Sequence, residues 1–80
     1  MSDDLSLDVR GRFQMASEEL GDFVKFLREN KVQAETETLD AFHSEGRAYG
    51  YGRVLKPFDF EAATNVYHTW RELQESLPRA

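Results

Sequence analysis

The two histidines, His43 and His68, are the side chains best suited to acid–base or nucleophilic chemistry, because the chain has no cysteine. A nucleophile needs a base beside it and a third group that orients that base. His43, Ser44 and Glu45 are the three residue types of such a triad. They are adjacent in a predicted tight turn, however, where their side chains point apart. His68 follows Tyr67 on a predicted helix. We therefore expect no catalytic residue and a protein that is not an enzyme.

Metal and phosphate sites have no better support in the sequence. A thiolate zinc site is excluded without cysteine, and neither a His-Glu-x-x-His motif nor the calcium spacing of an EF-hand is present. Glu35 and Glu37 share a face of a predicted strand, but no third ligand accompanies them. The glycines Gly46, Gly50 and Gly52 lie within a predicted hairpin rather than at a strand-to-helix turn, so they form no phosphate loop. We expect neither a metal nor a cofactor.

The segment from Arg47 to Val54 combines basic, aromatic and glycine residues. It resembles the eight-residue signature of RNA-recognition motifs, whose aromatic side chains stack on bases. The matching residues are Arg47, Tyr49, Gly50 and Tyr51, and the departing residues are Ala48, Gly52 and Val54. Asp8 stands about where the companion motif would place an aromatic residue, and no residues are left for the family's fourth strand. The resemblance implies a single-stranded nucleic-acid binder as an alternative function, and we do not assign the family.

The hydrophobic pattern predicts the elements that must position these residues. Apolar residues at alternate positions indicate a strand over 5–15, and Ser17 as an N-cap before apolar residues at helical spacing indicates a helix over 17–30. Strands are expected over 32–42 and 47–55, joined by a three-residue loop that ends at Gly46 with a positive φ. Asp59 is expected to cap a last helix and Pro78 to end it. Residues 1–4 are expected to be a flexible N-terminus and residues 78–80 a tail.

Pairing and core packing follow from these elements. Placing His43 opposite Arg47 aligns Ala41 with Tyr49, Leu39 with Tyr51 and Glu37 with Arg53 across the hairpin. The expected core consists of apolar residues from the first strand and the two helices: Leu5, Leu7, Val9, Leu20, Phe23, Val24, Leu27, Val66, Tyr67, Trp70 and Leu73.

The element order predicts one small α+β domain over residues 1–80. A right-handed crossover makes the first strand parallel to the second and places the third between them, which gives a mainly antiparallel sheet of order 1-3-2 with both helices on one face. The arrangement resembles a ferredoxin-like fold that lacks its fourth strand. It leaves one strand edge open and one sheet face bare, and a partner can bind at either place.

The bare sheet face holds the predicted binding residues. If Gly50 and Gly52 face the helices, the helices can approach closely and the tyrosines point outward; the alternative places the tyrosines in the core. We favour the outward arrangement, because Val54 shares the glycine face, although Leu55 and Leu39 share the tyrosine face. An outward surface of aromatic and arginine residues has the composition of an interaction hot spot. The predicted partner-binding residues are Arg10, Arg12, Tyr49, Tyr51 and Arg53.

Charge narrows the class of partner. The net charge of −5 argues against general binding to nucleic acid or to an anionic membrane, although the segment from Arg47 to Pro57 carries three basic residues and no acidic one. The acidic start, Met1 to Asp4, does not resemble a signal peptide, and the lack of cysteine suits a reducing compartment. We therefore expect a cytoplasmic protein that is complete from its start methionine.

These observations favour a small, acidic, non-enzymatic module that binds a partner protein. Inhibitors, immunity proteins, antitoxins and accessory subunits are modules of this kind, and acidic helix faces could cover a basic site on such a partner. The alternatives are the single-stranded nucleic-acid binder and a homodimer, the latter either as an end in itself or as the frame of a small-ligand site.

Overall fold

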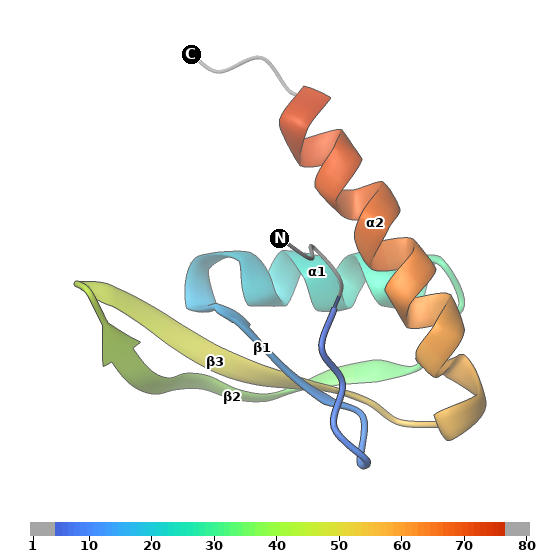
Figure 1. Ribbon diagram of the computed structural model, residues 1–80, viewed down its shortest axis with the longest axis horizontal. Helices are drawn as coiled ribbons and strands as arrows, with labels where there is room; N and C mark the ends of the chain where they lie inside the picture. Colours follow the sequence, from blue (N-terminus) through green and yellow to red (C-terminus); the bar gives the residue numbers. More distant parts are fainter. Residues whose placement is uncertain (1–4, 77–80) are drawn as a thin grey trace.

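In the computed structural model, residues 5–76 are described, and they form three strands and two α-helices around one core (Figure 1). The elements are β1 (Arg12–Ala16), α1 (Ser17–Glu29), β2 (Ala34–Ser44), β3 (Arg47–Val54) and α2 (Phe60–Ser76), with a short 3-10 helix, η1 (Pro57–Asp59), before α2. β3 lies between β1 and β2 and is antiparallel to both. The predicted α+β class, the element order and the strand order 1-3-2 are confirmed. The predicted N-terminal segment 1–4, the tail 78–80 and Pro78 lie outside the described residues.

Helix α1 packs on the sheet through one apolar face, as its spacing predicted. Its buried residues, at helical intervals, are Leu20, Phe23, Val24 and Leu27. Ser17 is not the N-cap as predicted; Ala16 takes that position, and the Ser17 hydroxyl donates to the carbonyl of Leu39. The helix ends in a Schellman arrangement in which the Val32 amide donates to the Leu27 carbonyl at 2.9 Å and Lys31 adopts a φ of 65°.

The first strand is shorter than the predicted range 5–15, because a turn interrupts it. The Asp8 carboxylate accepts hydrogen bonds from the backbone amides of Arg10 at 2.8 Å and Arg12 at 3.0 Å, and Gly11 has a φ of 83°. Val9, predicted to be in the core, is 94% exposed at this turn. Alternating polarity continues through the turn, so the pattern alone overestimates the strand.

The hairpin turn is tighter than predicted, which changes the pairing of β2 with β3. Glu45 and Gly46 form a two-residue loop, both with positive φ, as a type I′ turn requires. Ser44 rather than His43 therefore lies opposite Arg47, and two further irregularities follow along β2. The predicted pairs are wrong. The observed partners of Tyr49, Tyr51 and Arg53 are Phe42, Thr38 and Glu35.

The core centres on Phe23, whose ring lies 5.5 Å from those of Phe13 and Tyr67 and 5.3 Å from that of Trp70. Of the predicted core residues, six are buried (Leu5, Leu20, Phe23, Val24, Leu27 and Trp70) and three are partly buried against them (Leu7, Val66 and Tyr67). Leu73, by contrast, is 48% exposed. It lies toward the end of α2 that extends beyond the sheet and α1 (Figure 1).

Candidate functional site

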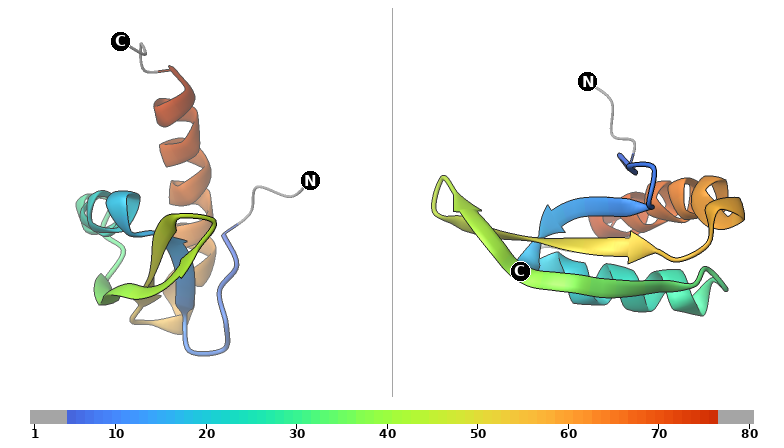
Figure 2. Two further views of the ribbon diagram at one scale, coloured as in Figure 1. Left: turned by 90° about the vertical axis from the view of Figure 1, so that its left-hand side faces the viewer. Right: turned by 90° about the horizontal axis from the view of Figure 1, so that it is seen from below.

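The bare side of the sheet is defined by the direction of the β3 side chains. A side chain at Gly52 would meet the ring of Phe13, one at Gly50 would meet Leu20 of α1, and Val54 is fully buried. These alternate residues point toward the helices, so Tyr49, Tyr51 and Arg53 point away from them. The structure thus places both tyrosines outward, as we expected. Seen from below, the sheet lies in front of both helices (Figure 2).

We call this side the outer sheet face and define it by nine residues. They are Arg12 and Gln14 of β1, Tyr49, Tyr51 and Arg53 of β3, and Glu35, Glu37, Thr38 and Phe42 of β2. Four of the five predicted binding residues belong to it. Arg10 borders the face from the turn that precedes β1, rather than from a strand as predicted.

An aromatic cluster occupies the part of the outer sheet face nearer the hairpin turn. Phe42 and Tyr49 are stacked, with ring centroids 5.3 Å apart and planes inclined by 15°. Tyr51 lies 6.2 Å from Phe42. The sequence prediction missed Phe42, because the predicted register put Ala41 opposite Tyr49. Phe42 could have been recognised as an aromatic partner of Tyr49 only if the two-residue hairpin turn had been predicted.

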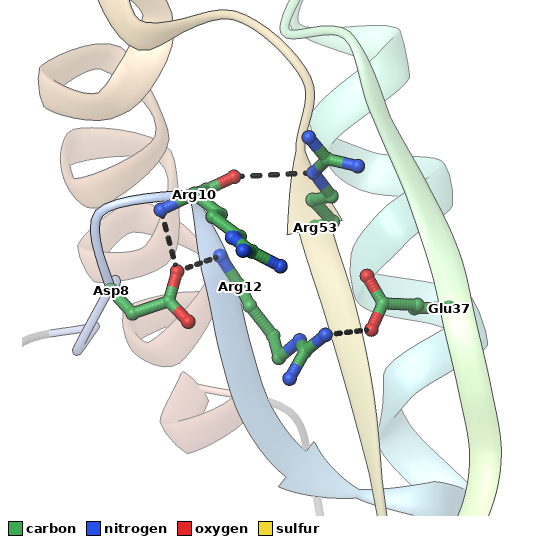
Figure 3. Close-up of polar contacts among 5 residues, drawn as sticks. All are labelled: Asp8, Arg10, Arg12, Glu37 and Arg53. Carbon is green, nitrogen blue, oxygen red and sulfur yellow. Dashed lines mark hydrogen bonds and ion pairs between the residues drawn. The ribbon is translucent and has the colours of Figure 1, made fainter.

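Arg12 crosses the middle strand and links the two edge strands. Its guanidinium lies 5.5 Å from the centre of the Tyr51 ring, and its Nη2 pairs with Oε1 of Glu37 at 2.7 Å (Figure 3). The cation–π contact and the ion pair hold the long side chain against the sheet. Arg12 is therefore a fixed part of the surface.

Arg10 and Arg53 present positive charge beside this fixed pair. Nε of Arg53 donates to the backbone carbonyl of Arg10 at 3.2 Å, and the side chain of Arg10 lies between those of Arg12 and Arg53 (Figure 3). Within residues 5–76, neither Arg10 nor Arg53 forms an ion pair with a carboxylate. Both guanidinium groups are available to an acidic group on another molecule.

The turn that carries Arg10 is held by Asp8. The backbone amides of Arg12 and Arg10 donate to its carboxylate and lower the pKa of Asp8 below its ordinary value of 3.8. An open groove of about 600 Å³ lies beside the turn, lined by residues 6–8, by the first three residues of β1 and by Tyr51. The groove widens the accessible surface next to Arg12 and Tyr51.

The two histidines lie on different elements of the fold. His43 lies at the exposed end of β2, with Nε2 3.5 Å from Oδ1 of Asp40, and His68 lies on α2 beside Tyr67. Among the described residues, no group of three or more His, Asp or Glu side chains is placed to hold a metal ion. Over the same part of the chain, neither helix is long and apolar enough to cross a membrane.

Comparisons with known protein families, with curated proteins and with solved structures find no match to this chain. Its function therefore has to be argued from the chemistry of the outer sheet face. That face offers an aromatic cluster, the fixed Arg12 and Arg53, and Arg10 borders it; neither Arg53 nor Arg10 has a carboxylate partner in residues 5–76. Tyrosine and arginine side chains are enriched among the residues that dominate the energy of binding interfaces.

Proposed function

We propose that this protein is a small non-enzymatic module that binds a partner protein through its outer sheet face. The supporting observation is the clustering of Phe42, Tyr49 and Tyr51 with Arg12 and Arg53 on a face that no described element covers. Tyr and Arg are enriched among the residues that dominate binding energy, and charged groups at the edge of such a patch guide the partner.

The rigidity of the surface supports the same function. Side chains on the opposite side of β1 and β3 are buried in the core, as Phe13, Met15 and Val54 show. The outer residues of β1 and β3 therefore lie on strands that core packing holds in place, and these residues need little ordering when a partner binds. A preformed surface of this kind suits a protein of the inhibitor, immunity-protein, antitoxin or accessory-subunit type, acting in the cytoplasm.

Single-stranded nucleic acid is a less suitable ligand for this face. Stacking platforms for bases combine free aromatic rings with a positive groove. Here Phe42 and Tyr49 stack on each other, Tyr51 lies under Arg12, and Glu35 and Glu37 place carboxylates among the arginines. These carboxylates repel a phosphate backbone but accept hydrogen bonds from a protein surface.

Alanine substitution of Tyr49 and of Tyr51 tests the proposal. We expect each variant to stay folded, losing about 1 kcal/mol of unfolding free energy with its ring contacts, and to lose about 2 kcal/mol or more of binding free energy. The wild type and both variants are immobilised and exposed to an extract of the producing cells. Proteins retained by the wild type alone are identified, and their affinities are then measured with purified components.

The matched control is Glu72→Ala, at an exposed position on α2. A partner retained equally by the wild type, the control and both tyrosine variants would show that the outer sheet face is not the binding surface. Titration with labelled oligonucleotides at two salt concentrations tests the alternative ligand. Tight, salt-dependent binding that is lost in Tyr49→Ala would show that the ligand of this face is nucleic acid rather than a protein.

A further inference from the structure

We infer that the outer sheet face binds a second copy of this chain, with the two sheets packed face to face about a two-fold axis. The inference rests on the proposed function insofar as that proposal makes the outer sheet face a docking surface. It adds the identity of the molecule that docks there. Two features of the face carry it: a pair of neighbouring opposite charges that do not bind each other, and the position of the aromatic cluster. The size of the surface sets the expected affinity.

The first feature is a pair of neighbouring opposite charges that do not bind each other. Arg53 on β3 and Glu35 on β2 are direct cross-strand partners, both pointing outward. In residues 5–76, Glu35 forms no ion pair, and the guanidinium of Arg53 donates instead to the Arg10 carbonyl. Each copy therefore presents a cation and an anion side by side at the same level of the sheet.

A two-fold axis makes this charge pair complementary to itself. An axis parallel to the strands and midway between β3 and β2 places β3 of one copy over β2 of the other, at the same level. Arg53 then faces Glu35 of the second copy, and Glu35 faces Arg53 of the second copy. Two identical ion pairs result, as expected of an isologous interface. Arg10, next to Arg53, adds a further cation near each pair.

The aromatic cluster selects the same axis. Tyr49 and Phe42 are also direct partners across β3 and β2, so the axis places Tyr49 over Phe42 of the second copy and the reverse. Because the two rings stack on each other, they form one apolar patch at that level. Turning one copy end for end would set these rings against Arg53 and Glu35 instead, leaving the charges without partners. Only the parallel arrangement matches apolar with apolar and acid with base.

The size of the face sets the expected affinity. One face of a three-stranded sheet is a small surface, and we expect the contact to bury less than the roughly 1,200 Å² in total that marks the lower end of stable interfaces. We therefore expect a monomer–dimer equilibrium with a dissociation constant in about the micromolar range or weaker. The chain needs no partner to be folded, because its core is complete within one copy.

Sedimentation velocity of the purified protein over a rising concentration series tests the inference. The apparent mass of the wild type should rise from 9.3 kDa toward twice that value. Glu35→Arg places two cations opposite each other at each contact, because residue 35 faces Arg53 of the second copy. Arg53→Glu places two anions opposite each other in the same way. Each variant alone should therefore associate about tenfold more weakly than the wild type. An equimolar mixture of the two variants restores both ion pairs in a heterodimer, and its association should return to the wild-type level.

The controls Glu72→Arg and Lys25→Glu make the same charge changes at exposed helix positions, and both should associate like the wild type. Circular dichroism verifies that every variant is folded. A wild type that stays at 9.3 kDa at all concentrations would overturn the inference. The proposed function would then still be supported by a different protein captured from the extract. A mixture no more associated than its separate components would overturn the pairing, as would equal losses in the helix controls.

Discussion

At the scale of single residues, Asp8 controls how the arginines reach the outer sheet face. Its carboxylate holds the backbone amides of Arg10 and Arg12, so the turn depends on a charged acceptor. The largest cause of the lowered pKa of Asp8 is the hydrogen bond from the Arg12 amide, and the second is the hydrogen bond from the Arg10 amide. A carboxyl whose pKa is lowered by folding stabilises the folded state above its unfolded pKa, and this contribution is lost as the pH falls through the folded pKa.

We therefore predict that the turn loosens on acidification to below the ordinary Asp value of 3.8. In NMR spectra recorded from neutral to acidic pH, the amide protons of Arg10 and Arg12 should move upfield as Asp8 takes up its proton. The variant Asp8→Asn keeps an acceptor oxygen without a titratable group, so the same amides should show no such transition. A transition that persists in Asp8→Asn would assign it to another group.

At the scale of elements, β3 is shaped by glycines that let the core lie directly on its backbone. The ring of Phe13 occupies the place where a side chain at Gly52 would lie. Because glycines and tyrosines alternate along the strand, the sequence predicted that both tyrosines share one face; it favoured the outward direction but did not decide it. The close contact with Phe13 is a tertiary feature with no sequence signal of its own.

Gly52→Ala should therefore destabilise the protein by about 1–3 kcal/mol, as overpacking of a core does. Gly21→Ala is the matched control, because Gly21 lies on exposed α1 surface with nothing near enough to clash. The control should raise stability by about 0.5–1 kcal/mol through helix propensity. Urea unfolding of both variants measures the difference. A Gly52→Ala protein as stable as the wild type would mean that Phe13 moves aside without cost.

Some features of the elements could be predicted from the sequence and others could not. The buried face of α1 follows its 3.6-residue spacing, and the order of the strands follows from chain connectivity. Neither the turn at Asp8 nor the irregular pairing of β2 with β3 changes the hydrophobic pattern. Pattern reasoning therefore placed Val9 in the core and left Phe42 out of the binding face. Four of the five predicted binding residues lie on the outer sheet face because side-chain alternation survives both errors.

At the scale of the whole molecule, the two helices are packed to different extents. The sheet and α1 share an extensive core, whereas α2 packs mainly against α1. Among the side chains of α2 that the structure describes, Ala63 and Trp70 are fully or nearly buried. Trp70 contacts Phe23 at the centre of the core, while Leu73, one turn further along, is half exposed. One large side chain thus anchors the outer part of α2.

Trp70→Ala should then lower the free energy of unfolding by about 3–5 kcal/mol, the usual cost of removing a large buried aromatic side chain. A chain of 80 residues has about 4–12 kcal/mol in total, so this variant would be close to unfolding. Leu73→Ala is the matched control on the same helix and should cost less than about 1 kcal/mol, because that side chain is half exposed. Urea unfolding followed by far-ultraviolet circular dichroism compares the two variants without relying on tryptophan fluorescence. Equal losses in both variants, or a Trp70→Ala protein as stable as the wild type, would show that α2 is not anchored through the contact between Trp70 and Phe23.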